Sequence, residues 1–454
     1  MNLQKSYYNY LERNYISIKT EKMRYKPLSS VFYKKNRINF ADSMLSKSIA
    51  VFNSNDIYPI SADSTYFPFQ QHRDIFYLTG IEQEETILMI FPEAEKIKER
   101  EILFIKETDE KISIWEGEKL SLEKARDLSG IETVFWLSDF EKIFKSLAKK
   151  CEKLHINTNE HYRAKVETQT REDRFITWAK KKCPSLKHVK GNLILQRLRS
   201  VKTDEEINQI QKACEITEKG FKRILNFVSP GVYEYEIEAE FSHEFIKNSS
   251  MGFAYQPIVA SGKNNNVLHY IKNNCICKSG DLVLIDVGAE YGNYSSDMTR
   301  TIPVSGKFSE RQRKVYNAVL KVKNEATKLL TPGTLWKEYH HEVGKIMSSE
   351  LISLGLLTEF EVKNQNSKDP AYKKYFMHGT SHHLGLDTHD YGLIDEPMKE
   401  NMVFTVEPGI YLPKEGFGIR LEDDVVIKEK GEARNLMKDI PIDPNEIEEL
   451  MSKN

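Results

Sequence analysis

Acidic residues stand at the ends of apolar runs throughout the C-terminal half of this chain. Asp286 ends the run 282–285, Glu407 follows the run 402–406, and Glu422 lies between residues 419–421 and 425–427. An ionised carboxylate on a buried strand costs several kcal/mol unless a positive charge or a metal ion compensates it. The chain must therefore fold so that these carboxylates meet a compensating charge.

Asp297 and His382 extend this set to five residues of the types that bind metal ions. Taken alone, two aspartates beside a strand pair are more often turn and capping residues, but a hairpin between Asp286 and Asp297 would bring both carboxylates to one point. Four carboxylates and one neutral imidazole carry four negative charges, which two divalent cations balance. The set predicts a two-metal hydrolase site for hard, oxygen-preferring ions.

Four of the 12 histidines fall within residues 378–389. Any one of them alone is more often a core or loop residue, and the glycines around them favour a loop or strand over the H-E-x-x-H helix of zinc proteases. Arg420 and Glu422 would share one face of a strand, from which Arg420 can hold a ligand carboxylate in place.

Composition limits which kinds of partner the chain can bind and in which compartment we expect it. The chain has 454 residues, a length suited to two domains, and Lys+Arg 66 against Asp+Glu 67 excludes a strongly charged partner such as nucleic acid. Five cysteines, an odd number, do not form a disulfide framework. Since no stretch reaches about 18 consecutive apolar residues and the N-terminus lacks a signal-peptide run, we expect a cytoplasmic protein with no membrane partner.

Three segments are expected along the chain. Residues 1–24 form a polar extension, residues 25–200 an α/β domain and residues 201–454 a second domain. In the first domain the patterns predict strands at 49–52, 86–91 and 101–105 and helices at 138–151 and 168–182, the former opened by a capping box of Ser138 and Glu141. Trp115 is expected to pack within this domain.

The second domain repeats one pattern. Capping boxes at Thr203/Glu206 and Ser309/Gln312 open helices that stop at Pro-Gly pairs, and each pair is followed by a further helix, at 234–247 and 335–351, and then by strand-like runs carrying ligand candidates. This duplication predicts a pseudo-two-fold domain with its site between the halves.

Taken in this order, the motifs over residues 200–430 resemble the pita-bread metallopeptidases: methionine aminopeptidases, Xaa-Pro dipeptidases (prolidases) and Xaa-Pro aminopeptidases. Residues 61–64, 74–80 and 255–264 resemble aminopeptidase P in particular. The resemblance implies an α/β (α+β) protein with an N-terminal creatinase/prolidase-type α/β domain and a C-terminal pita-bread catalytic domain. It also implies a homodimer or homotetramer.

The resemblance implies two manganese ions per subunit, with cobalt or zinc as substitutes. Asp297 and Glu422 would bridge the ions, Asp286 would chelate one, and His382 and Glu407 would complete the other. The implied substrates are peptides with proline in the second position, from which the first residue is released.

The family also supplies roles for the remaining candidates. Glu407 would take a proton from the attacking water and pass it to the leaving nitrogen. His269, His378 and His389 match histidines that line the substrate pocket, and Arg420 would support a ligand.

Three other functions stay open from the sequence. A prolidase of the same fold would capture the free carboxylate of a dipeptide, a task in which Arg420 could take part. A non-catalytic binding module and a creatinase-like enzyme are both disfavoured, because such relatives lose metal ligands and this chain keeps all five.

Overall fold

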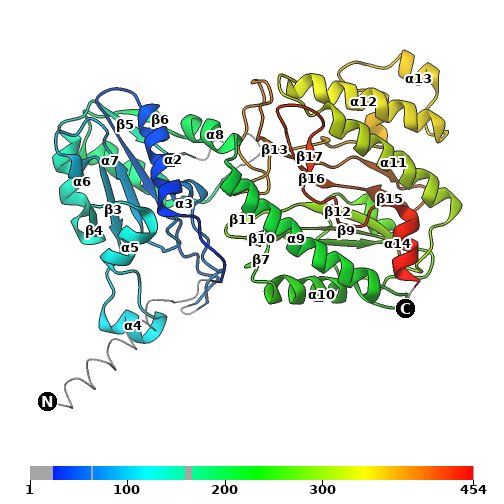
Figure 1. Cartoon of the computed structure of the whole chain (residues 1–454), viewed down its shortest axis with the longest axis horizontal. Helices are drawn as coiled ribbons and strands as arrows, with labels where there is room; N and C mark the ends of the chain where they lie inside the picture. The colour runs from blue at the N-terminus through cyan, green and yellow to red at the C-terminus, as the bar shows by residue number, and fades with distance from the viewer. Residues whose placement is uncertain (1–23, 63–64, 159–165, 453–454) are drawn as a thin grey trace.

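The computed structural model describes residues 24–62, 65–158 and 166–452. The predicted extension 1–24 lies outside these residues, apart from Arg24. Two bodies lie side by side, an N-terminal lobe and a C-terminal lobe, and helix α8 (Asn192–Ser200) leads from one to the other (Figure 1).

A mixed six-stranded sheet organises the N-terminal lobe, with strand order β4-β3-β2-β1-β5-β6. Strand β2 pairs antiparallel with both β1 and β3, whereas β4 joins β3, β5 joins β1 and β6 joins β5 in parallel. The strands are β1 (Ser48–Asn53), β2 (Ile87–Ile90), β3 (Glu101–Ile105), β4 (Val134–Trp136), β5 (Lys153–Ile156) and β6 (Lys187–Lys190). The helices are α2 (Ser30–Asp42), α3 (Arg73–Thr79), α4 (Glu110–Glu116), α5 (Leu122–Ser129), α6 (Phe140–Ala148) and α7 (Arg171–Lys182).

Alternation along β1 shows why helices cover both faces of this sheet. Ile49 and Val51 pack with Phe144 of α6 and Phe175 of α7, while Phe52 packs on the opposite face with the residues of α2 and α3. Successive side chains of a strand point to opposite faces, so a strand that is buried throughout needs a cover on each side. The predicted strands and the two predicted helices are confirmed.

Two local expectations for the N-terminal lobe are wrong. Ser138 lies in a single 3-10 turn (Leu137–Asp139), and the N-cap of α6 is Asp139, whose side chain makes no capping hydrogen bond. Trp115 does not pack in the lobe: it is 80% exposed on α4, which projects from the lower edge of the lobe in Figure 1. The side chain of Trp115 finds no apolar cover because α4 has no buried residue.

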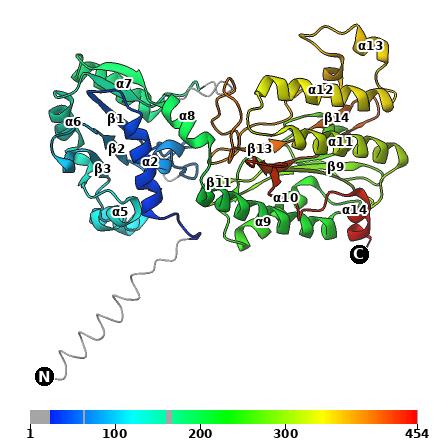
Figure 2. The same ribbon diagram turned by 45° about the horizontal axis from the view of Figure 1, so that its top comes forward.

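The C-terminal lobe contains two helix pairs with strands between them (Figures 1 and 2). Helix α9 packs on α10 and α11 on α12. The helices are α9 (Asp204–Phe227), α10 (Glu234–Lys247), α11 (Glu310–Leu329), α12 (Trp336–Ser353), α13 (Glu359–Lys363) and α14 (Pro444–Met451). The strands are β7 (Gly252–Phe253), β8 (Ile258–Ser261), β9 (Leu282–Val287), β10 (Ala289–Tyr291), β11 (Tyr294–Ser295), β12 (Met298–Pro303), β13 (Val403–Val406), β14 (Gly409–Leu412), β15 (Phe417–Arg420), β16 (Asp423–Val426) and β17 (Arg434–Asn435).

This arrangement confirms the predicted pseudo-two-fold lobe. The capping boxes of Thr203 with Glu206 and Ser309 with Gln312 open the long helices α9 and α11, as expected. Hydrogen bonds then join the strands of the two halves, since Glu422 donates its backbone N–H to the carbonyl of Thr299 at 3.0 Å. The ligand candidates meet along this seam.

All five cysteines are free thiols, in agreement with the sequence. Among the described residues, none of the helices combines the length and the apolar composition needed to span a bilayer.

Candidate metal centre

A strand pair brings the two aspartates of the candidate site together. Strands β9 and β12 pair antiparallel with Asp286 opposite Thr299, so Asp297, which directly precedes β12, lies beside Asp286. The Tyr255 hydroxyl lies 2.6 Å from Asp286 Oδ1 and 2.5 Å from Asp297 Oδ1. The predicted convergence of these two carboxylates is therefore present in the fold.

Hydrogen bonds of the backbone also bring Glu407 and His382 close to Asp297. Glu407 follows β13, and its N–H donates to the carbonyl of Thr380 at 2.7 Å, which sets the histidine loop beside that strand. His382 Nδ1 lies 2.9 Å from the carbonyl oxygen of His383, so Nε2 faces the carboxylates, 3.4 Å from Asp297 Oδ2 and 3.9 Å from Glu407 Oε1.

The donor set fits divalent metal ions. Asp297, His382 and Glu422 each offer one ligand atom, and these three atoms lie within 4.8 Å of one another. All three residues are buried. Carboxylate oxygens with one imidazole suit hard or borderline cations such as Mn²⁺ and Zn²⁺. The hydrogen bond at His382 Nδ1 orients the ring as metal-binding histidines require.

The carboxylates repel one another, which shows in their pKa values. Desolvation, reinforced by Asp297, Glu407 and Asp286, raises the pKa of Glu422 well above its ordinary value. Desolvation also raises the pKa of Asp286, against the opposing effect of Arg420. The pKa of Glu407 rises to about 7, through desolvation and the charges of Asp297 and Asp286, although His382 and Arg420 lower it. A bound cation would remove this penalty.

Arg420 compensates one of the four charges. Its Nη2 donates to Asp286 Oδ2 at 2.6 Å and its Nη1 to the Tyr411 hydroxyl at 2.9 Å. Tyr411 in turn lies 2.8 Å from His378 Nε2. The carboxylate that Arg420 holds is thus that of Asp286, and Glu422, its expected neighbour on the strand face, lies in the short link between β15 and β16. A chain of contacts links the histidine loop to the ligand on β9.

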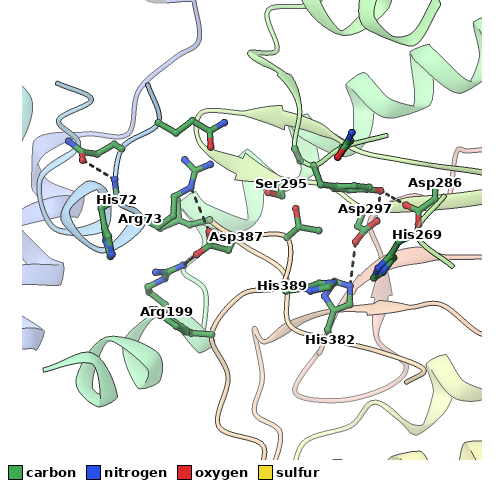
Figure 3. A pocket seen from close by; sticks show the side chains of 18 of the residues that line it. His72, Arg73, Arg199, His269, Asp286, Ser295, Asp297, His382, Asp387 and His389 are labelled. Atoms are coloured by element: carbon green, nitrogen blue, oxygen red, sulfur yellow. Dashed lines mark hydrogen bonds and ion pairs between the residues drawn. The ribbon is translucent and has the colours of Figure 1, made fainter. Parts of the chain in front are cut away.

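A cavity of about 1120 Å³ opens over this centre and runs between the lobes. All nine residues singled out in the sequence line it: Asp286, Asp297, His382, Glu407, Glu422, His269, His378, His389 and Arg420. His269 and His389 lie close to the carboxylates in Figure 3, and the His389 ring is 4.3 Å from that of His382. His383, the fourth histidine of the cluster, packs against Phe404 in the core instead.

Several residues at this centre are not among the candidate site residues that the sequence predicts. Tyr255 lines the cavity and contacts two of the carboxylates, and Arg73 and Arg199 bring the N-terminal lobe to it, beside Asp387 (Figure 3). Tyr411 contacts Arg420 and His378. The segment around Tyr255 resembles aminopeptidase P, but no local pattern indicates that the Tyr255 hydroxyl contacts two aspartates. The arginines belong to ion pairs between distant segments, for which sequence spacing gives no signal.

Comparisons with known proteins agree with this geometry. Residues 208–429 match the model of metallopeptidase family M24, and residues 33–156 match that of the aminopeptidase P N-terminal domain. The chain is 34% identical to the Xaa-Pro aminopeptidase of Escherichia coli over 86% of this chain and 90% of that protein. It is 31% identical to human Xaa-Pro aminopeptidase 3, over 88% of this chain and 80% of that one.

A solved structure of zinc-substituted E. coli aminopeptidase P in complex with product superposes with a TM-score of 0.86 at 32% identity, covering 94% of this chain and 99% of that one. Both lobes are therefore shared with relatives that carry this combination of domains. The expected fold is confirmed: the chain belongs to the aminopeptidase P group of metallopeptidase family M24.

Proposed function

We propose that this chain is a metal-dependent Xaa-Pro aminopeptidase, which hydrolyses the first peptide bond of substrates with proline in the second position. The observation that supports this most strongly is that the five predicted metal ligands, the three predicted substrate-pocket histidines and Arg420 all line one cavity. Relatives named Xaa-Pro aminopeptidase match both lobes. The prolidase alternative has no specific observation in its favour.

We assign two divalent cations, Mn²⁺ in the native protein with Co²⁺ or Zn²⁺ as substitutes, to Asp286, Asp297, His382, Glu407 and Glu422. By the resemblance to the family, Asp297 and Glu422 would be shared between the ions. Hard oxygen donors favour manganese over softer ions. The chemistry that such cations supply is Lewis acidity, which makes a hydroxide nucleophile available near neutral pH.

Glu407 is the proposed proton carrier. Its carboxylate would accept a proton from the attacking water and release it to the leaving nitrogen within one turnover. His378, 3.7 Å from Glu407 Oε2, and the more exposed His269 and His389 would orient the substrate carbonyl. Arg420 would keep the Asp286 carboxylate in place during the proton transfer.

Proline in the second position explains why a dedicated site is needed. An Xaa-Pro bond has no N–H, and its ring fixes the backbone, so an enzyme that aligns its substrate through that N–H cannot use it. The leaving group is a secondary amine that must be protonated. His269 and His378 border the space where a pyrrolidine ring would lie.

Metal content and activity together test this assignment. Protein stripped with a chelator should lose activity, regain it with Mn²⁺ and bind two ions per chain by elemental analysis. A fully active metal-free protein would contradict the proposal, and a folded protein that retains no metal would favour the binding-module alternative.

We also propose a cytoplasmic homodimer or homotetramer, with residues 25–200 and 201–454 as its domains. Free thiols suit a reducing compartment. Tyr66, Phe67 and Trp115 expose large apolar surfaces on the N-terminal lobe, as residues at subunit interfaces do in isolated chains. Light scattering on wild type and Trp115→Ala tests this: a monomeric wild type would refute it.

A further inference from the structure

A second group of buried charges lies between the lobes, outside the metal ligands. Arg199, on α8, is 2% exposed and donates to three carboxylates: Asp74 Oδ1 at 2.7 Å, Asp387 Oδ2 at 2.7 Å and Asp390 Oδ1 at 2.6 Å. Asp74 belongs to α3 of the N-terminal lobe, whereas Asp387 and Asp390 belong to the loop that follows His382. Arg199 thus connects the lobes beside the metal centre (Figure 3).

The loop residues that contact Arg199 flank His389 in the sequence. Its two partners in the loop stand two residues before and one residue after His389, and its guanidinium lies 4.5 Å from the centre of the Tyr391 ring. Lys202 Nζ adds a contact to Asp390 Oδ2 at 3.0 Å. The N–H of Asp390 donates to the carbonyl of His383 at 2.9 Å. The backbone on both sides of His389 is therefore fixed.

A contribution to stability does not by itself explain why these buried charges are present. The desolvation of buried ions offsets most of their attraction, and apolar side chains of similar volume often stabilise a protein as well or better. A planar guanidinium instead imposes direction, because its fork holds several carboxylates in fixed positions. Here the imposed geometry sets a loop that carries His389, whose ring lies 4.3 Å from His382.

We propose that Arg199 is a positioning residue, which holds the loop 387–391 against Asp74 and thereby sets His389 over the metal centre. Through it, the N-terminal lobe takes part in the reaction without touching the reacting atoms. This inference rests on the proposed role of His389 in Xaa-Pro cleavage.

A double-mutant cycle tests the coupling. Arg199→Lys keeps the positive charge but cannot span three carboxylates, so kcat/KM for an Xaa-Pro-Xaa tripeptide should fall about tenfold or more. In a His389→Ala background the same change should cost almost nothing further, because its effect passes through His389. Arg197→Lys is the matched control: Arg197 lies on the same helix, its side chain is 62% exposed and it pairs with Glu396. It should leave both backgrounds unchanged.

A readout independent of turnover completes the test. The imidazole NMR resonances of His389, identified by their loss in His389→Ala, should shift in Arg199→Lys and stay in place in Arg197→Lys. If Arg199→Lys does not fold, Asp387→Asn serves instead, because its side chain is 46% exposed and it removes one leg of the network.

The outcomes separate this inference from the proposed function. Independent losses in the double mutant, or unmoved His389 resonances in the loop variants, would overturn the positioning role even in an active peptidase. Lack of Xaa-Pro cleavage by the unmodified protein would contradict the proposed function, and the His389 resonances would still decide whether Arg199 sets the loop.

Discussion

Replacement of Gly288 by Ala should damage the metal centre through sterics alone. Gly288 joins β9 to β10, and a Cβ atom there would lie 1.7 Å from the backbone oxygen of Ser296. Contacts under 3.0 Å are essentially never seen, so the two segments must separate by at least 1.3 Å, the difference between 3.0 and 1.7 Å. Gly288 stands two residues after Asp286, and Ser296 stands directly before Asp297. The separation therefore moves one predicted ligand away from the other.

A misplacement of about 1 Å costs on the order of 100-fold in rate, and overpacking destabilises a core by about 1–3 kcal/mol. We expect Gly288→Ala to fold with reduced stability, to bind Mn²⁺ at least about tenfold more weakly by isothermal titration calorimetry, and to lose roughly 100-fold in kcat/KM.

Gly416→Ala is the control for strain without displacement. Gly416 lies in the turn between β14 and β15 with φ +78 and no neighbour within 4 Å of an added Cβ. Its cost of about 1–2 kcal/mol should leave the affinity for metal unchanged. Wild-type affinity in Gly288→Ala, or an equal loss of affinity in Gly416→Ala, would refute the reasoning.

Three further predictions concern single groups. Glu407→Gln should lower kcat by roughly 10²–10⁴-fold in steady-state assays at saturating Mn²⁺; an undiminished kcat would exclude Glu407 as proton carrier. Arg300→Met should lower the free energy of unfolding by about 3 kcal/mol and so lower the urea midpoint, since Arg300 is fully buried and holds Asp423 at 2.6 Å; an unchanged midpoint would contradict this. Burial raises the pKa of Glu172 from 4.5 to about 8 despite its hydrogen bonds from Asn53. Between these two values the folded state keeps a proton on Glu172 that the unfolded state releases. The stability of the fold should therefore decrease as pH rises from about 4.5 to about 8. Urea unfolding across this range should show a weaker fall in Glu172→Gln, and an identical pH dependence would rule Glu172 out.

Local signals explain what the sequence predicts well. The capping box of Thr203 with Glu206 depends on residues three apart, and the apolar run of β9 marks a strand wherever it lies. Asp286 and Glu407 border such runs, so their burial, and with it the need for a compensating charge, can be inferred before any fold is known. Both line the cavity as expected.

Contacts between distant segments explain what the sequence does not reveal. Arg199 meets Asp74 and Asp390 across 125 and 191 residues, and no spacing rule connects them. The hydroxyl of Tyr255 reaches its aspartates only because β9 and β12 pair in one register. The exposure of Trp115 follows from the way α4 projects, which a helical pattern cannot encode.

Product analysis with manganese-loaded protein tests the central claim most directly. An Xaa-Pro-Xaa tripeptide and an Xaa-Pro dipeptide are offered side by side, and the released amino acids are followed by mass spectrometry. The account predicts release of the first residue from the tripeptide, with the dipeptide cut slowly or not at all. Cleavage of the dipeptide alone would contradict it and assign the cavity to a dipeptidase.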